Sequence, residues 1–277
     1  MSAYNATKAA LYTPAEDVTF FANGRPESHA ELCAEMSRLA YLKFEDGDEN
    51  RSSLEAILQA VGFNSWKFFN RNGTQCFYCR DSEASILSFR GTESDDPTDV
   101  FTDAYALPLR WSGAGRVHAG FAAALRLVQD DISALLSQHD LPLIITGHSL
   151  GAALATLAAS IWTPHALYTF GSPRVGDDEF GASLASIDTH ERFVDCCDIV
   201  TRVPPELGIY KHVGELNYID QNGSIVRQAD DDVIDADRSS ARAAYLLKYT
   251  FVKGNVSTRD LADHAPVNYL SAFTGRT

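Results

Sequence analysis

The chain has 277 residues, of which 45% are hydrophobic, and its formal net charge is −14. This length and apolar content suit one large α/β domain over residues 1–277, because a chain of this size can bury a substantial core. The negative charge argues against nucleic acid and strongly anionic membranes as partners. No apolar run approaches the ~20 residues of a transmembrane helix.

The N-terminus and the cysteines bear on the compartment. Residues 1–16 lack the basic start and the long apolar stretch of a signal peptide. Five cysteines are an odd number, so at least one thiol is unpaired within the chain. Cys76 and Cys79 lie in an expected strand, where side chains three positions apart point to opposite faces, so a shared metal or disulfide is not expected. Cys196 and Cys197 look like core residues. We expect a reducing compartment, with the cytoplasm favoured over secretion.

The first third of the chain predicts two helices followed by three strands. Apolar residues recur at helical spacing over 27–44, and a shorter helix is expected over 52–61. Strands are expected over 66–69 and 74–80, joined by an Asn-Gly turn that is typical of hairpins. A third strand is expected over 84–89.

Residues 93–111 are predicted to form a lid. Asp96 followed by Pro97 is a typical helix start. The apolar face of the short helix that follows consists of Val100, Phe101, Ala104 and Tyr105. Such a helix can pack permanently on the core or can cover and uncover a site. Its place directly after a strand end favours a lid, since lids are usually irregular insertions over sites.

The second half of the chain alternates strands and helices, which is typical of a mostly parallel sheet flanked by helices. The expected elements are a helix over 120–138, strands over 141–146, 166–170 and 191–197, and a late hairpin over 209–219 and 223–228. The acidic stretch 230–237 lacks the spacing of an EF-hand calcium loop. We interpret it as a solvated loop.

Gly147-His148-Ser149-Leu150-Gly151 stands between an apolar strand and a helix rich in alanine and leucine. Strand, G-x-S-x-G and helix together indicate a nucleophile elbow. A side chain at 147 or 151 would collide with the neighbouring strand or helix in so tight a turn. Ser149 would stand at the C-terminal end of the strand, beside a helix N-terminus that favours negative charge. The pattern alone also occurs by chance, but its context favours a nucleophile.

A serine hydroxyl needs an adjacent base, and the base needs a carboxylate to orient it. His190 begins an expected strand and precedes any good acid, and His212 sits in an expected strand where alternation suggests a packed residue. His264 lies in a late loop and is the predicted base. Asp198 is the predicted acid, because it comes just beyond a strand whose end shares the sheet edge with Ser149. Its alternative role is that of a turn or helix cap.

Two other aspartates near this strand are less suitable as the triad acid than Asp198. Asp195 lies inside the expected strand, and Asp188 precedes it.

The oxyanion of a tetrahedral intermediate also needs hydrogen-bond donors. The backbone N–H of Leu150 is one, and Thr92, after the strand over 84–89, offers a backbone N–H and a hydroxyl as the second. Thr92 could also be an ordinary strand-end turn residue.

Six segments together resemble the class 3 lipase family and follow its order along roughly residues 30–275. They are Phe89-Arg90-Gly91-Thr92, Val117-His118-Ala119-Gly120-Phe121, Gly147-His148-Ser149-Leu150-Gly151, Phe170-Gly171-Ser172-Pro173-Arg174-Val175-Gly176, Asp198-Ile199-Val200 with Pro204-Pro205, and Asp263-His264. The resemblance implies an α/β-hydrolase fold with a lid in 93–111, a Ser149–Asp198–His264 triad, and an oxyanion hole of Thr92 and Leu150.

The family hydrolyses carboxylic esters, often of lipids, without a metal or organic cofactor. We therefore expect a lipase-type serine hydrolase whose lid residues Val100, Phe101 and Tyr105 contact a lipid or small ester substrate. Transient contact with lipid aggregates is expected as well. The alternatives are an esterase for soluble feruloyl or short-chain esters, a phospholipase, and an inactive α/β-hydrolase scaffold used for binding.

Overall fold

The computed structural model describes residues 4–92, 107–138, 140–205 and 209–274. The strands are β1 (Ser65–Arg71), β2 (Thr74–Arg80), β3 (Ser85–Phe89), β4 (Pro108–Arg110), β5 (Arg116–His118), β6 (Leu143–His148), β7 (Ala166–Phe170), β8 (Thr189–Asp195), β9 (Glu215–Ile219) and β10 (Ile225–Arg227). The α-helices are α1 (Lys8–Tyr12), α2 (His29–Leu39), α3 (Asp48–Ala60), α5 (Ala119–Leu136), α6 (Leu150–Trp162), α7 (Asp178–Ser183), α8 (Asp231–Lys248), α9 (Arg259–Ala262) and α10 (Pro266–Thr274). Short 3₁₀ turns are η1 (Pro14–Glu16), η2 (Phe20–Asn23) and η3 (Val200–Arg202).

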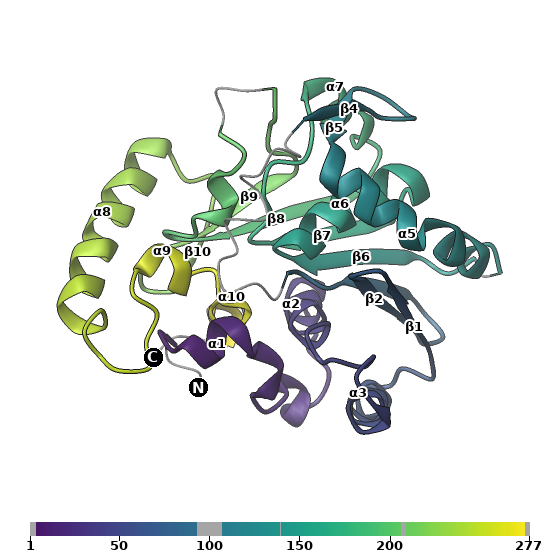
Figure 1. Cartoon of the computed structure of the whole chain (residues 1–277), viewed down its shortest axis with the longest axis horizontal. Coiled ribbons are helices and arrows are strands. Elements are labelled where there is room, and N and C mark those ends of the chain that lie inside the picture. The colour runs from purple at the N-terminus through teal and green to yellow at the C-terminus, as the bar shows by residue number, and fades with distance from the viewer. Residues whose placement is uncertain (1–3, 93–106, 139, 206–208, 275–277) are drawn as a thin grey trace.

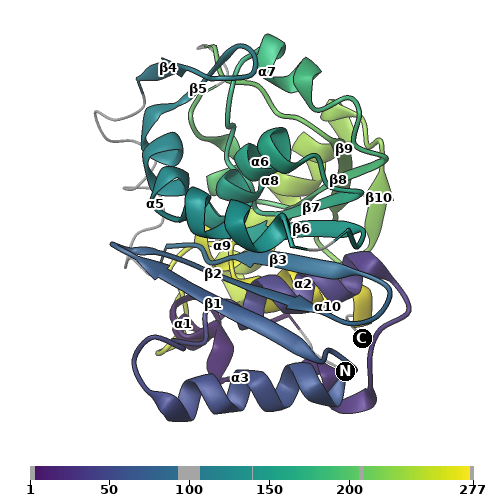
Figure 2. The same ribbon diagram turned by 90° about the vertical axis from the view of Figure 1, so that its right-hand side faces the viewer.

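A central sheet of eight strands organises the molecule, in the order β1-β2-β3-β6-β7-β8-β9-β10. The pairings from β3 through β6, β7 and β8 to β9 are parallel, and the outer pairings are antiparallel. Helices cover both faces, with α5 and α6 on one side and α2, α3 and α10 on the other (Figure 1, Figure 2). The predicted α/β-hydrolase architecture, a mostly parallel sheet flanked by helices, is confirmed.

The two faces of the sheet carry separate apolar layers. One layer joins the sheet to α5 and α6, and the other joins it to α2 and α10. Cys76 belongs to the first layer and Cys79 to the second, as expected for strand positions three apart.

The register brings several strand ends to one edge. Phe89 at the end of β3 lies opposite Gly147 of β6, and Gly147 lies opposite Thr169 of β7. Because parallel strands end at the same edge, the segments that follow β3, β6, β7 and β8 meet there.

The acidic stretch after β10 is a helix rather than the solvated loop expected from the sequence. Asp230 takes the extended conformation of an N-cap, and Asp231 and Asp232 occupy the first turn of α8. Carboxylates are favourable there because the helix dipole is positive at its N-terminus. The buried residues Ile234, Ala241 and Tyr245 follow at helical spacing, so the helix is anchored by a narrow apolar stripe.

Residues 209–214 also differ from the expected strand, because β9 begins only at Glu215. This segment is a loop that touches its neighbours through an isolated bridge between Gly176 and Lys211. His212 therefore lies in a loop. Asp220 and Gly223 still close the predicted turn between β9 and β10.

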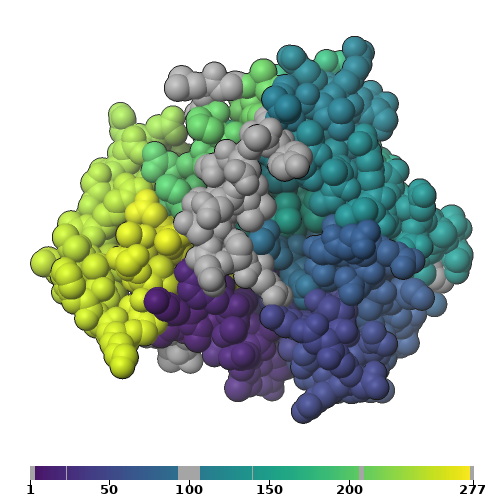
Figure 3. Space-filling model, viewed as in Figure 1, coloured from purple at the N-terminus to yellow at the C-terminus, as the bar shows by residue number. Residues whose placement is uncertain are grey.

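The start of the described chain lies against its end. The backbone N–H of Asn5 donates to the side chain of Asn268 on α10, and Figure 3 shows the purple N-terminal segment beside the yellow C-terminal one. None of the described helices combines the length and the apolar character needed to cross a membrane. The predicted lid helix, with Val100, Phe101 and Tyr105, falls in 93–106, outside the described residues.

Candidate active site

Ser149 stands in a sharp turn between β6 and α6. Its φ of 60° and ψ of −128° are unusual for a residue with a side chain, and such a conformation costs of order 1–3 kcal/mol. A Cβ at Gly147 would overlap the carbonyl oxygen of Gly151, and a Cβ at Gly151 would overlap the carbonyl oxygen of Phe89. Both glycines are therefore needed for this geometry, as the collision argument from the sequence predicted.

Three side chains from separate segments form one hydrogen-bonded chain. The Nε2 atom of His264 is 2.8 Å from Oγ of Ser149. The Nδ1 atom of His264 is 2.9 Å from Oδ2 and 3.0 Å from Oδ1 of Asp198. All three residues are buried. With the Nδ1 proton facing the carboxylate, Nε2 is left as the acceptor for the serine proton.

Further donors hold the carboxylate of Asp198 in place. The hydroxyl of Tyr269 on α10 donates to Oδ2 at 2.5 Å, and the backbone N–H of Val200 donates to Oδ1 at 2.8 Å. Gly171 has a φ of 60°, and a Cβ on it would lie 2.9 Å from Oδ2. A larger residue there would push on the acid and on the imidazole of His264, so glycine keeps this space open.

The segments before the acid and before the base are tied to each other. The backbone N–H of Cys197 donates to Oδ2 of Asp263 at 2.9 Å, and these residues immediately precede Asp198 and His264. Asp263 also accepts from Tyr4 at 2.7 Å and from Arg259 at 3.0 Å. This buried network fixes the distance between the two loops.

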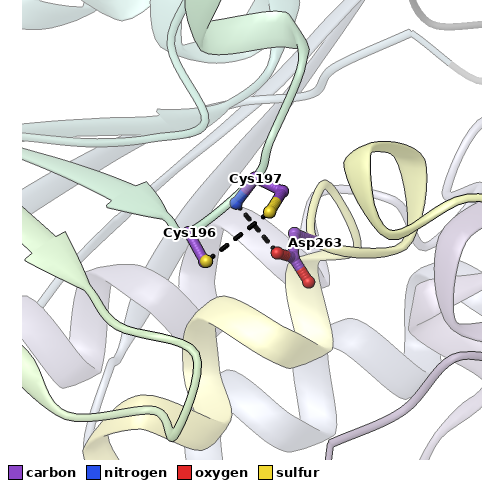
Figure 4. A group of neighbouring side chains, drawn as sticks. All are labelled: Cys196, Cys197 and Asp263. Carbon is purple, nitrogen blue, oxygen red and sulfur yellow. Dashed lines mark hydrogen bonds between the residues drawn. The ribbon is translucent and has the colours of Figure 1, made fainter. Parts of the chain in front are cut away.

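The Sγ atoms of Cys196 and Cys197 and a carboxylate oxygen of Asp263 lie within 4.8 Å of one another, which is the spacing of a metal site (Figure 4). The carboxylate, however, is already an ion-pair partner of Arg259. The hydrogen bond with Cys197 and burial raise the pKa of Cys196, so its thiol stays protonated. The chemistry of this donor set therefore fits a neutral hydrogen-bonded cluster better than a cation site.

His148 directly precedes Ser149 in the chain, and its ring lies next to the ring of His264. Its Nδ1 atom is 2.8 Å from the hydroxyl of Tyr41, and its ring centroid is 4.5 Å from that of His264. Burial and the adjacent His264 lower the pKa of His148, which keeps the ring neutral. A neutral His148 adds no positive charge beside the imidazole of His264.

The predicted oxyanion donors lie at the same sheet edge. Leu150 is the first residue of α6, so its N–H has no acceptor within the helix. Thr92 follows β3, which pairs with β6. The Oγ1 atom of Thr92 is buried and has no hydrogen-bond partner among the described residues. Both donors follow strands that end at the sheet edge where Ser149 stands.

The other histidines and aspartates considered as base or acid lie outside the hydrogen-bonded chain of Ser149, His264 and Asp198. His212 lies 2.7 Å from the carbonyl of Thr201 through Nε2, and burial lowers its pKa. Burial also lowers the pKa of His190, to about 4. Asp188 is at the surface, 3.0 Å from His165. The N–H of Asp195 donates to the hydroxyl of Tyr269.

The contacts of Tyr269 and Tyr41 with the site were not predicted from the sequence. Each lies on or just after a helix, far from Ser149 along the chain, and no local motif marks its hydroxyl. Asp263 did stand in a quoted segment, but its link to the acid loop depends on tertiary structure.

Comparison with known proteins finds similarity to lipases. Residues 86–208 match the family model described as lipase (class 3). Triacylglycerol lipase OBL1 of Arabidopsis thaliana is 28% identical over 251 residues, with 66% of this chain and 48% of that protein covered. Secreted mono- and diacylglycerol lipase A of Penicillium cyclopium is 33% identical over 174 residues, with coverage of 57% and 55%. The chain spans about half the length of the curated relatives it matches.

Among solved structures, the lipase from Rhizopus microsporus var. chinensis is 27% identical, with a TM-score of 0.52, covering 69% of this chain and 71% of that one. Fold and elbow together define a member of the α/β-hydrolase class. Residues 86–208 and the ordered segments are similar to the class 3 lipase family, which the curated relatives also represent.

Proposed function

We propose that the protein is a serine hydrolase that cleaves carboxylic esters of lipids. The observation that carries this proposal is the hydrogen-bonded chain from Asp198 through His264 to Ser149 in a nucleophile elbow. The names of the relatives, triacylglycerol lipase and mono- and diacylglycerol lipase, support a lipid ester as substrate.

The geometry supports a two-step acyl transfer. Nε2 of His264 accepts the hydroxyl proton while Oγ of Ser149 bonds to the ester carbonyl carbon. The resulting oxyanion accepts hydrogen bonds from the N–H of Leu150 and from Thr92. The imidazolium then gives its proton to the leaving alcohol, and an acyl-enzyme remains. Water, deprotonated by His264, then attacks the acyl carbon, and the imidazolium returns this proton to Oγ of Ser149 as the acid leaves, while Asp198 stabilises the charged imidazolium in both steps.

The lid belongs to this proposal. Val100, Phe101 and Tyr105 would cover the acyl site in water and would contact lipid when displaced, recovering part of the ~1.5–3 kcal/mol of burial energy of a large apolar side chain. We propose transient contact with lipid aggregates on this basis. In an esterase with a fixed pocket wall, the rate would not depend on contact with lipid aggregates.

Hydrolysis rates on p-nitrophenyl esters of increasing chain length and on emulsified triacylglycerol test the substrate class, with Ser149→Ala as the blank. A lipase gives turnover on the emulsion and a rise in rate across the solubility limit of the ester. Phe101→Asp should lower the emulsion rate far more than the soluble short-chain rate. Turnover confined to soluble esters would make the protein an esterase, and turnover only on phospholipid would make it a phospholipase.

We further propose a reducing compartment, with the cytoplasm favoured. The support is that the five cysteines are buried free thiols, although three fungal relatives are named as secreted. Thiol titration of the denatured protein, isolated under alkylating conditions, should find all cysteines reduced. A disulfide would contradict this assignment.

A further inference from the structure

A cavity of about 750 Å³ is lined by residues of β8, β9, α8 and the 3₁₀ turn η3, among others. Val194 of β8 and Leu216 of β9 line its floor, and Ile234 of α8 forms part of a wall. Ser149, His264 and Asp198 are not among the described residues that line it. It is therefore separate from the candidate active site.

Positive charge gathers in this cavity although the chain as a whole is strongly negative. The cationic residues among the described lining are Arg174, Arg192, Arg202, Lys211 and Arg238. They come from separate segments of the chain and converge only in the fold. Three carboxylates also line the cavity, from Asp178, Asp231 and Asp235. Cations therefore outnumber carboxylates, in contrast to the −14 of the whole chain.

Arg192 is the central feature of the cavity. It lies on β8 opposite Thr169, with its Nε atom buried and without a hydrogen-bond partner among the described residues. No ion pair joins its guanidinium to any carboxylate in the described part of the chain. Burial and the nearby Arg174 lower its pKa to about 10, so it remains a cation at neutral pH. A shielded cation of this kind is costly unless an anion meets it.

Within the described residues, none of the three lining carboxylates forms an ion pair with Arg192. His212 lies on the same wall with its Nε2 atom 2.7 Å from a carbonyl, and burial beside Arg192 and Arg174 keeps it neutral. The Nε atom of Arg238 donates to the carbonyl oxygen of Cys196, and its Nη1 atom lies 3.7 Å from Oδ1 of Asp235. The guanidinium of Arg238 therefore partly neutralises the carboxylate of Asp235. The uncompensated charge at Arg192 thus faces a space large enough for a small organic molecule.

We propose that this cavity binds the phosphate group of a small organic phosphate. Several guanidinium groups around one space match the multiple oxygen acceptors of a phosphate, and charge-assisted hydrogen bonds of this kind are strong. The phosphate can belong to a free metabolite or to a lipid headgroup. The site is independent of ester hydrolysis, and its test needs no turnover.

Thermal unfolding with increasing inorganic phosphate or glycerol 3-phosphate, at constant ionic strength against chloride, measures binding. We expect a saturable rise in Tm for the wild type, because a ligand of the native state stabilises it by mass action. Arg192→Met should abolish the rise and leave the unliganded protein as stable or more stable, since it removes a partly buried cation that has no ion-pair partner among the described residues. Arg51→Met, on the distant α3, is the charge-matched control and should respond like the wild type.

Lys211→Gln removes a half-buried cation of the lining and serves as a second variant should Arg192→Met fail to fold. We expect it to weaken phosphate binding about tenfold. Flotation with phosphatidylcholine vesicles, with and without phosphatidic acid, separates the sources: vesicle binding lost in Lys211→Gln assigns a lipid headgroup, and binding of glycerol 3-phosphate alone assigns a free ligand. No saturable effect of any of these probes on the wild type, or equal effects in wild type and variants, would overturn the proposal.

Discussion

The hydroxyl of Tyr269 lies 2.5 Å from Oδ2 of Asp198 and receives a hydrogen bond from the backbone N–H of Asp195. It therefore joins the end of β8 to the proposed catalytic acid through α10. Asp198 is buried, so the loss of a donor is not made good by bulk water.

Tyr269→Phe should lower kcat by roughly ten- to a hundredfold, because a hydrogen bond to a charged group is worth about 1.5–3 kcal/mol. The acidic limb of the pH–kcat profile should also move, since the loss of a donor to Asp198 changes the interaction of its carboxylate with the imidazolium. Steady-state kinetics measured from about pH 5 to about 9, where a histidine base titrates, would detect both effects. Tyr245→Phe, which removes another buried tyrosine hydrogen bond, should lower Tm without moving the pH profile.

Thr92→Val keeps the shape and the backbone N–H at the predicted oxyanion hole but deletes the buried hydroxyl. If Oγ1 donates to the oxyanion, kcat should fall by about 10²- to 10³-fold with little change in KM. Thr92→Ser, which retains the hydroxyl, should recover most of the rate. Equal kcat in wild type and Thr92→Val would reduce Thr92 to a backbone donor or a turn residue.

The choice of base can be tested by comparing two histidines. His264→Ala should lower kcat by several orders of magnitude while the protein stays folded. His212→Ala should lower Tm through the lost contact with Thr201 and leave kcat within a few-fold of wild type. Circular dichroism confirms folding of each variant. An inactive but folded His212→Ala, beside an active His264→Ala, would reverse the assignment.

The stability of the fold should depend on the neutral form of His118. This residue caps α5 by accepting from the N–H of Phe121, and burial lowers its pKa to about 4. Its folded pKa lies below the unfolded value of about 6.5, so acid protonates the unfolded state first. The free energy of unfolding should therefore fall as pH drops from about 6.5 to about 4. His118→Asn keeps a cap without titrating and should flatten this fall in urea titrations, whereas the exposed His29→Asn should not.

The candidate site was predictable from sequence where a local pattern and a sheet edge sufficed. The elbow depends on Gly147 and Gly151 within one turn, and the positions of Asp198 and His264 depend on strand and chain order. Tyr269 could not be found in this way, because its hydroxyl reaches the acid only through the packing of α10. α8 was missed because its opening run of aspartates was interpreted as solvated, although a helix N-terminus stabilises the same charges.

Ser149 is the proposed nucleophile of the candidate active site. Labelling with a fluorophosphonate probe, followed by peptide mapping, tests it most directly, because the probe bonds covalently to an activated serine. We predict one modified residue, Ser149, with labelling lost in Ser149→Ala and strongly slowed in His264→Ala. Labelling that persists in a folded Ser149→Ala, or a folded wild type that hydrolyses esters but maps to another residue, would contradict the account.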